Sequence, residues 1–223
     1  MPLYHSLTLH NEIDLIIWKV EEEESFFYSN QWWYPKEKKW LESIHPKRRM
    51  EFLASRYILH NHLLPQKNIP LIKDEFGKLR FENGKQFLSI SHSGRYSSFV
   101  IGPKEMGLDV QMYDIKILNI LNKFLSDREV LFISRIRNIK EKVQTAILLW
   151  SAKEAIYKAH GKRGIQFNQQ ISLYFEHGNL TGGSLSLPEE TIKYDFVYNK
   201  EEEFIWIVAY HSEQLVNISD DFL

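Results

Sequence analysis

The chain of 223 residues is 43% hydrophobic and 26% charged, which is typical of a globular protein with one large or two small domains. Its formal net charge of −1 excludes the broad basic surface of nucleic-acid-binding proteins, so an anionic ligand has to be bound by a local cluster of basic groups. The chain has no cysteine, which excludes disulfides and thiol catalysis. It has no predicted signal peptide and no apolar run near the ~20 residues that span a bilayer, so we expect a cytoplasmic protein that binds no membrane.

The first half of the chain predicts a strand, a helix and a β-meander. Residues 13–20 read as a strand, and residues 46–64 carry apolar side chains at helical spacing. Residues 71–102 contain short apolar runs separated by turn signals at Gly77 and Gly84, which predicts a meander.

The helix predicted over residues 46–64 is the first basic element. Pro46 suits a first helical turn, and Ser43 is a candidate cap just before it. Arg49 and Arg56 are seven residues apart, so we expect them on one stripe of this helix.

The second half predicts a strand, two helices and further strands. Gly102-Pro103 marks a boundary, and residues 106–114 alternate as a strand. Residues 115–136 and 138–160 read as helices, followed by the strands ISLYF, YDFVYN and EFIWIVAYH. The order of elements predicts an α+β fold in two halves of similar length.

The first segment with chemical potential is Ser91-His92-Ser93-Gly94-Arg95. Small hydroxyls, a glycine and basic groups at the end of a strand suit a phosphate site. By itself the segment is weak evidence, and an ordinary turn that carries a surface histidine is the simpler interpretation.

The second segment is Gly107-Leu108-Asp109-Val110-Gln111. A carboxylate on an otherwise apolar strand requires a partner, because burying an unpaired charge is costly. Mg²⁺ prefers oxygen ligands and would be such a partner, although an exposed sheet face would explain Asp109 equally well.

The third segment is WSAKEAIYK, residues 150–158. Trp150, Glu154 and Lys158 lie at i, i+4 and i+8, along one face of a helix. In an isolated helix, Glu154 and Lys158 would most simply form a surface ion pair.

The order and spacing of these three segments resemble the 4'-phosphopantetheinyl transferase superfamily. Its pattern is a serine-histidine pair, a glycine-x-aspartate-x-glutamate strand, and then tryptophan-x-x-lysine-glutamate-x-x-x-lysine. Two flanking features agree, namely Phe76-Gly77-Lys78 and Phe124-Leu125-Ser126 followed by Glu129. The resemblance spans roughly residues 47–165.

The chain length resembles the monomeric, two-lobed branch of this superfamily, the surfactin-synthetase-activating type. This implies two pseudo-symmetric α/β lobes of similar fold. Residues 1–102 would form the N-terminal lobe on the side of the nucleotide and its 3'-phosphate, and residues 103–223 the C-terminal lobe with the metal site and the catalytic helix.

The resemblance also implies a reaction. A serine hydroxyl of an apo carrier protein attacks the β-phosphate of coenzyme A, and 3',5'-ADP leaves. Asp109 and Glu154 would be ligands of Mg²⁺, Glu154 would take the serine proton directly or through water, and Lys158 would neutralise or protonate the leaving phosphate. Gln111 stands where the family usually has glutamate, so it would give the metal ion only a neutral oxygen ligand, through water or directly. Mn²⁺ could then take the place of Mg²⁺.

The remaining site residues are expected to bind coenzyme A. His92 with Ser91 resembles the 3'-phosphate site, with Lys78 near the same nucleotide. In the basic helix, Arg56 matches the family, while Lys47 and Arg49 compete for a second position. Lys153 is expected to point either toward the ligand or to solvent.

The expected partner is a carrier protein that is acidic around its modified serine. Lys116, Lys123 and Arg128 follow the metal strand and are candidates for steering it. Carrier proteins of fatty acid, polyketide and nonribosomal peptide synthesis all remain open.

Two alternative functions remain open. A catalytically impaired homologue would bind coenzyme A or a carrier protein without turnover, and Gln111 favours it. A metal-dependent phosphohydrolase would release phosphopantetheine without any carrier protein. His60-Asn61-His62 does not indicate a metal site, because positions i and i+2 on a helix point in different directions.

Overall fold

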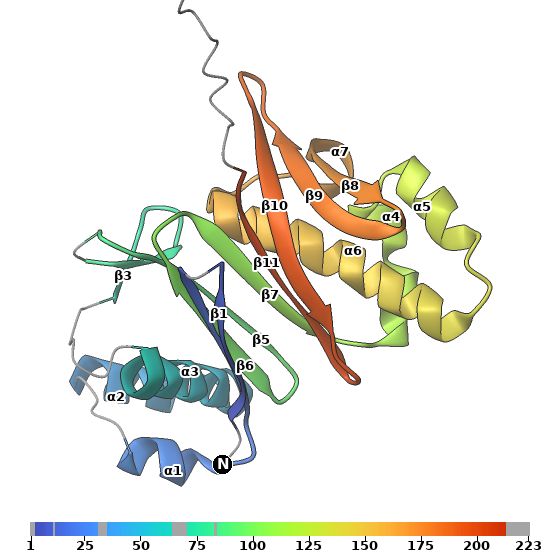
Figure 1. The fold of residues 1–223 in the computed structure, drawn as a ribbon. Helices are drawn as coiled ribbons and strands as arrows, with labels where there is room; N and C mark the ends of the chain where they lie inside the picture. Colours follow the sequence, from blue (N-terminus) through green and yellow to red (C-terminus); the bar gives the residue numbers. More distant parts are fainter. Residues whose placement is uncertain (1–2, 11, 31–34, 64–70, 83, 213–223) are drawn as a thin grey trace, which may run out of the picture.

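The computed structural model describes residues 3–10, 12–30, 35–63, 71–82 and 84–212. It contains a four-stranded and a five-stranded antiparallel sheet, each covered by helices, with a two-stranded ribbon beside them (Figure 1). The mixed α and β architecture that the sequence predicted is therefore confirmed, whereas the pseudo-symmetry of two lobes stays a prediction. No helix in these ranges is long and apolar enough to cross a membrane.

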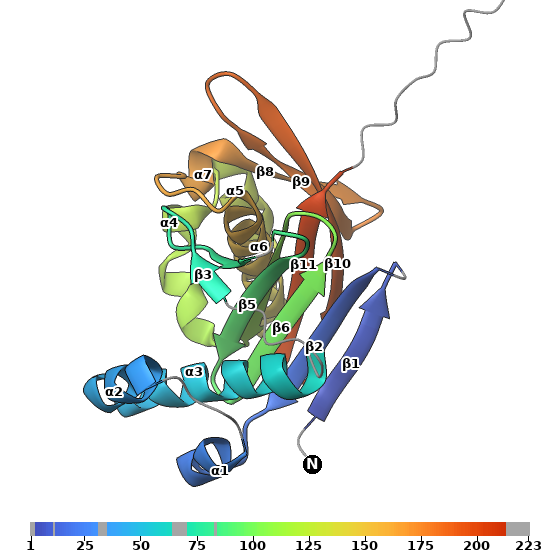
Figure 2. The same ribbon diagram turned by 90° about the vertical axis from the view of Figure 1, so that its left-hand side faces the viewer.

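The four-stranded sheet comes from the first half of the chain and has the strand order β1-β2-β6-β5. Helix α3 lies against it, and α1 and α2 pack on α3 (Figure 2). The elements of this half are β1 (Leu3–Leu9), β2 (Ile13–Lys19), α1 (Glu24–Ser29), α2 (Pro35–Ser43), α3 (Pro46–Ile58), a π-helical turn (Leu59–Leu63), the ribbon β3 (Leu71–Lys73) and β4 (Leu79–Phe81), β5 (Phe87–Ser93) and β6 (Tyr96–Gly102).

The five-stranded sheet comes from the second half and has the order β7-β11-β10-β9-β8. The 22-residue helix α6 lies across it, with α4, α5 and α7 beyond (Figure 1). The elements of this half are β7 (Met106–Met112), a 3-10 turn (Ile115–Asn119), α4 (Leu121–Phe124), α5 (Asp127–Ser134), α6 (Ile139–His160), α7 (Phe167–Gln170), β8 (Ile171–Glu176), β9 (Asn179–Ser186), β10 (Thr191–Lys200) and β11 (Phe204–His211).

The two sheets share part of their hydrophobic core. One buried cluster joins Ile17 and Val100 of the first sheet to Leu108, Val110 and Trp206 of the second. Burial of apolar surface across this junction is the main force that holds the two halves together. The division of the chain at residues 102 and 103 stays a prediction, and this cluster draws on both sides of it.

The helix predicted over residues 115–136 is wrong, because the structure breaks it into three short helical pieces. Ser126 accepts a hydrogen bond from the backbone N–H of Glu129, and the Glu129 carboxylate accepts one from the backbone N–H of Ser126. This capping box starts the new helix α5, and its Ser-x-x-Glu pattern is visible in the sequence.

The predicted cap of α3 is also wrong. His45 occupies the N-cap position, and its ring accepts a hydrogen bond from the backbone N–H of Lys47. Ser43 instead ends α2 and donates to the carbonyl of Trp40. Strands β1 and β9 and helices α1, α2 and α7 are not among the elements that the sequence predicts.

Candidate active site

The candidate site lies where α6 passes over the edge strand β7. Both ends of α6 are capped, by the Asn138 side chain and by Gly161 in the left-handed conformation. A Cβ atom on Gly107 would lie 2.0 Å from the carbonyl oxygen of Ala155 and 2.4 Å from the backbone nitrogen of Ala159. Glycine at position 107 therefore allows α6 to approach β7 closely enough for side chains of the two elements to meet.

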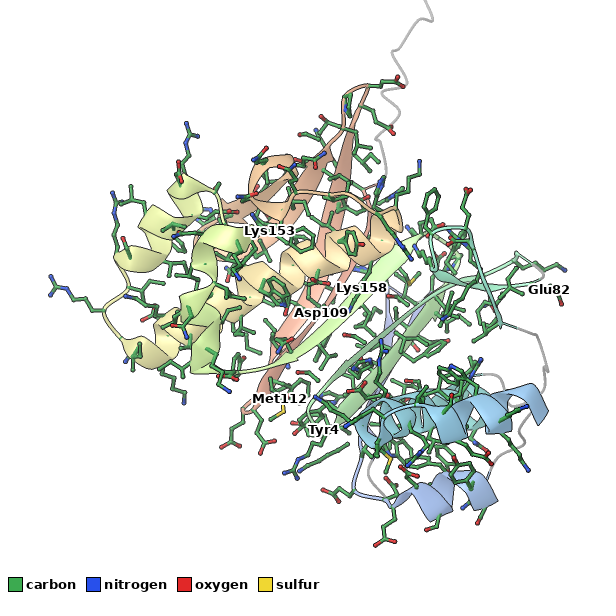
Figure 3. The ribbon with its side chains drawn as sticks, turned by 180° about the vertical axis from the view of Figure 1, so that it is seen from behind. Tyr4, Glu82, Asp109, Met112, Lys153 and Lys158 are labelled. Atoms are coloured by element: carbon green, nitrogen blue, oxygen red, sulfur yellow. The ribbon has the colours of Figure 1, made fainter. Side chains whose placement is uncertain are left out.

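Asp109 and Lys158 form an ion pair across this contact (Figure 3). The Lys158 ammonium donates to Asp109 Oδ1 at 2.8 Å, to Ser91 Oγ at 2.9 Å and to the carbonyl of Leu108 at 3.0 Å. The side chain of Asp109 is only 7% exposed. The Asp109 and Lys158 side chains thus face each other in a half-buried site, so Asp109 is not on an exposed sheet face and Lys158 is not simply paired with Glu154 at the surface.

Glu154 lies one helical turn before Lys158 on the same face of α6. Burial raises the pKa of its carboxyl group, the negative charge of Asp109 raises it further, and the positive charge of Lys158 partly offsets both. Glu154 is therefore a stronger base than an ordinary glutamate, as a group that accepts a proton near neutral pH needs to be.

The oxygen atoms at this site fit a divalent cation. Asp109 Oδ2 is buried and makes no hydrogen bond to any described residue. The negative charge of Asp109 raises the pKa of Glu154, and a hard cation bound by both carboxylates would relieve this repulsion. Gln111 lies two residues beyond Asp109 on β7 and so on the same face of the strand, where its amide donates at 3.5 Å to the carbonyl of Met112.

The described part of the chain holds no group of three or more histidine, cysteine, aspartate or glutamate residues that would form a metal site alone. Asp109 and Glu154 can therefore provide two carboxylate ligands. The remaining ligands would have to be neutral oxygens or belong to a substrate.

The prediction that Lys153 points to the ligand or to solvent is wrong. Its side chain is completely buried on the side of α6 that faces α4, α5 and α7 (Figure 3). The ammonium donates to the carbonyls of Phe124 and Phe167 at 3.0 and 3.1 Å and to Glu129 at 2.7 Å. Its side chain has no exposed surface and lies on the side of α6 away from Asp109, so Lys153 is left out of the site.

Ser91 and His92 do not act side by side, because neighbouring residues of a strand point to opposite faces. Ser91 points to β7, is buried, and bonds to Asp109 and Lys158. Its hydroxyl has no remaining capacity for a phosphate, so the prediction that Ser91 binds the 3'-phosphate is corrected. His92 points toward α3, where its Nδ1 atom lies 3.5 Å from Glu51 Oε1.

Two neighbouring cavities border the site. One of about 270 Å³ is lined by Lys158, Tyr157 and the turn around Gly77. The other, of about 480 Å³, lies between α3 and β5 and is lined by Arg56 and His92. Leu79 and Ile90 line both cavities, so the two cavities lie next to each other, with Lys158 at the smaller one and His92 at the larger one.

Lys78 lines the smaller cavity, but its ammonium is already bound. It donates to Glu105 at 2.5 Å and to the carbonyl of Ala159 at 2.8 Å, at the C-terminal end of α6. Burial lowers the pKa of Lys78, and Glu105 opposes this. Lys78 thus joins the β3–β4 ribbon to α6 at the edge of the smaller cavity.

The basic residues of α3 divide between two sides of the helix. Arg49 donates to both carboxylate oxygens of Glu24 at 3.0 and 2.9 Å, so it is committed to α1, and the prediction that it binds the nucleotide is corrected. Arg56 lies over the ring of Phe52 and lines the larger cavity together with Arg48. Arg48 is not among the candidate residues selected from the sequence. Its position eight residues before Arg56, with Phe52 midway between them, nevertheless indicates that the two arginines share one face of α3.

Lys47 and Lys73 complete the set of basic groups near His92. Lys73 of β3 lines the larger cavity and was not predicted. Lys47 is exposed and lines a third cavity of about 380 Å³, which His92 also borders. Burial lowers the pKa of His92, and the positive charges of Lys158 and Lys47 lower it further, against the opposing effect of Glu51.

Comparisons with known proteins agree with part of this site. A model of the 4'-phosphopantetheinyl transferase superfamily matches residues 105–209, a range that includes Asp109, Gln111, Glu154 and Lys158. A search of curated proteins finds no match. Among solved structures, the chain is similar to the crystal structure of a holo-ACP synthase from Plasmodium yoelii, with 21% identity, a TM-score of 0.41, and coverage of 48% of this chain and 92% of that one. The predicted resemblance to the superfamily is thus confirmed for residues 105–209, and the two-lobed branch stays a prediction.

Proposed function

We propose that this protein is a 4'-phosphopantetheinyl transferase that moves phosphopantetheine from coenzyme A to a serine of an apo carrier protein. The observation that carries the proposal is the meeting of Asp109, Glu154 and Lys158 in one half-buried site, with Asp109 Oδ2 left unpartnered. The superfamily match covers all three residues. A pure binding module has no need of a carboxylate with a raised pKa one turn from an ammonium group.

In the proposed reaction, the serine oxygen of the carrier forms a bond to the β-phosphorus of coenzyme A. The bond from this phosphorus to the oxygen that bridges the two phosphates breaks, and 3',5'-ADP leaves with that oxygen and the electron pair. Glu154 accepts the serine proton, for which its raised pKa suits it. Lys158 lines the smaller cavity and stabilises the charge that develops on the leaving phosphate.

Asp109 and Glu154 would hold a divalent cation, Mg²⁺ or Mn²⁺, with Gln111 contributing directly or through water. When bound, such an ion supplies neutralisation of the crowded pyrophosphate charge. The buried Asp109 Oδ2 and the two mutually repelling carboxylates support this assignment.

The two adjacent cavities are the proposed binding site of coenzyme A. The pyrophosphate would lie by Lys158 and the 3'-phosphate by His92, with Arg56, Arg48 and Lys73 as nearby cations. This basic lining reconciles an anionic substrate with a chain whose net charge is −1.

The proposed carrier protein would dock beside the end of β7. Lys116, Lys123 and Arg128 are exposed there, and exposed Ile115 and Ile139 border a groove of about 290 Å³. The groove begins at Tyr113, four residues and therefore roughly 13 Å along the chain from Asp109. A small acidic domain with an apolar contact point would be able to reach the groove and the site together, and we expect one protein chain to act as a monomer.

Intact-mass spectrometry of apo carrier proteins tests the proposal. Fatty acid, polyketide and nonribosomal peptide carriers are each incubated with the protein, coenzyme A and Mg²⁺. We expect a mass gain of one phosphopantetheine on at least one carrier, and no gain with Glu154→Gln. Binding of coenzyme A without a mass gain on any carrier would instead support the catalytically impaired homologue, for which Gln111 would be the first residue to explain.

A further inference from the structure

The two sheets are joined by a row of serine hydroxyls that we call the serine ladder, formed by Ser89, Ser91 and Ser93 of β5. Residues at i, i+2 and i+4 of a strand point to one face, and here that face meets the edge of β7. The three hydroxyl oxygens accept hydrogen bonds, each 3.0 Å long, from the backbone N–H groups of Leu108, Val110 and Met112. The ladder satisfies amides that an edge strand would otherwise leave unpaired.

Ser91 is the middle member of the ladder, and it makes two further contacts. Its oxygen accepts from the Lys158 ammonium at 2.9 Å, and its hydroxyl donates to Asp109 Oδ1 at 3.1 Å. For Ser89 and Ser93, the hydrogen bonds found among the described residues include none to the side chains of Asp109 or Lys158. Ser91 alone thus belongs both to the ladder and to the site.

The direction of the Ser91 hydroxyl is fixed by its partners. A serine hydroxyl donates one hydrogen bond and accepts two. Two of its three neighbours, the Val110 N–H and the Lys158 ammonium, are donors, so the single proton has to point to Asp109 Oδ1. Ser91 is 4% exposed, so water has little access to compete for these bonds.

This arrangement also fixes the carboxylate of Asp109. Ser91 and Lys158 both bind Oδ1, which leaves Oδ2 buried and unpartnered as the oxygen that a cation can take. Without Ser91, one of the two hydrogen bonds that select this orientation is lost, and the Lys158 ammonium loses one of its three acceptors.

We propose that Ser91 is a positioning residue, which orients Asp109 and Lys158 from across the seam between the two sheets instead of binding the substrate itself. The proposal deepens the proposed function and rests on it. It predicts that a residue of the first sheet controls the geometry of the proposed metal ligands and of Lys158, all of which come from the second half of the chain. Groups that orient metal ligands are typically worth about 10–100-fold in metal affinity or activity.

Ser93 offers a matched control, because Ser93→Ala removes the same kind of bond to a β7 amide without touching the site. The experiment compares wild type, Ser91→Ala, Ser91→Thr and Ser93→Ala. Transfer to an apo carrier protein gives kcat and the KM for coenzyme A. Independently of activity, the electron paramagnetic resonance signal of free Mn²⁺ gives the Kd for Mn²⁺, measured with coenzyme A present and expressed per folded molecule.

We expect Ser91→Ala to lower kcat and to raise the Kd for Mn²⁺ by about tenfold or more, with the KM for coenzyme A changed less than about twofold. Ser91→Thr keeps the hydroxyl and should recover most of both losses. Ser93→Ala should leave both quantities within about twofold of wild type.

Equal losses of kcat and of Mn²⁺ affinity in Ser91→Ala and Ser93→Ala would overturn the proposal, because the serine ladder would then only hold the two sheets together. An unchanged Kd for Mn²⁺ in Ser91→Ala would overturn it as well. If wild type transfers nothing to any carrier, the proposed function fails, while the Mn²⁺ comparison between Ser91→Ala and Ser93→Ala still decides whether Ser91 positions the site.

Discussion

Lys153 and Lys158 lie five residues apart in the second half of helix α6, and their surroundings differ in one informative way. Each ammonium donates three hydrogen bonds within the protein, one of them to a carboxylate. Lys153 is completely buried, whereas 27% of the Lys158 side chain is exposed.

The difference lies in the carboxylate partners. Glu129 binds Lys153 and also accepts from the backbone N–H and the hydroxyl of Ser126, so its charge is well compensated. Asp109 binds Lys158 through Oδ1 but keeps Oδ2 buried and without a partner, near a second carboxylate, Glu154. A saturated ion pair stabilises the fold, while an unsaturated one retains capacity for a ligand.

The largest expected effect is a loss of transfer activity when Lys158, but not Lys153, is replaced. Lys158→Met should lower kcat for phosphopantetheine transfer by about 10²–10⁴-fold, because it removes the cation at the leaving phosphate. The variant also leaves Asp109 without its cation, so circular dichroism and the Tm have to show that the assayed protein is folded. A loss of less than about tenfold would remove Lys158 from the proposed chemistry.

The matching change at the other lysine should act on stability. Lys153→Met leaves Glu129 without its buried cation and should lower the free energy of unfolding by about 3–5 kcal/mol, measured by urea denaturation. The double variant Lys153→Met/Glu129→Gln should recover part of this loss, because no unpaired charge remains. A single variant as stable as wild type would mean that the pair is not structural.

The contact between α6 and β7 can be tested at Gly107. Gly107→Ala places a Cβ atom against the backbone of α6, which cannot yield as a side chain can, and should cost about 1–3 kcal/mol of stability while also lowering kcat. Gly102→Ala is the control, because the first atom that its Cβ would meet is the flexible end of Met106. Equal effects on kcat in the two variants would argue against a specific role of the close approach.

A smaller effect concerns the charge of Glu154. The pKa of Glu154 in the folded protein is raised, mainly by burial and by the charge of Asp109. The contribution of this group to stability is therefore fully present below its unfolded pKa of about 4.3, where the carboxyl group is protonated in both states. It is lost as the pH rises through the folded pKa and the buried group becomes charged. Glu154→Gln should therefore raise the Tm at pH 7, and the gain should vanish below about pH 4, although the variant is inactive. The exposed control Glu176→Gln should leave the Tm unchanged, and a Tm lowered by Glu154→Gln at pH 7 would contradict the burial of that charge.

The smallest effect is expected at the docking surface, outside both lysine sites. Reversing the charge of Lys116, Lys123 and Arg128 to glutamate should raise the KM for an acidic carrier protein severalfold and leave the KM for coenzyme A unchanged. Lys193→Glu, an exposed change on β10, is the control. If the KM for the carrier stays the same, these residues do not steer it.

Spacing along single elements predicted the part of the site that lies on α6 and β7. Glu154 and Lys158 share one face of α6 at i and i+4, and the same geometry turns Lys153 about 100° away from Glu154. The direction of Lys153 was therefore open to prediction from the sequence, as were the face of Arg48 and the opposite directions of Ser91 and His92.

The contacts between elements could not be predicted in this way. Ser91 and Asp109 belong to different sheets, and no repeat in the sequence indicates that a serine side chain of β5 meets an amide of β7. The commitment of Arg49 to Glu24, 25 residues earlier in the chain, is likewise a product of packing between α1 and α3. Tertiary partners decide which of several similar charged residues remains available for a ligand.

The most direct test of the proposed transferase measures both products of the reaction together. Wild type is incubated with coenzyme A, Mg²⁺ and an apo carrier protein, and 3',5'-ADP and holo-carrier are quantified in the same samples. We expect one 3',5'-ADP for each holo-carrier formed, and neither product when the carrier is omitted. Release of 3',5'-ADP and free phosphopantetheine without a carrier would contradict it and would indicate a phosphohydrolase.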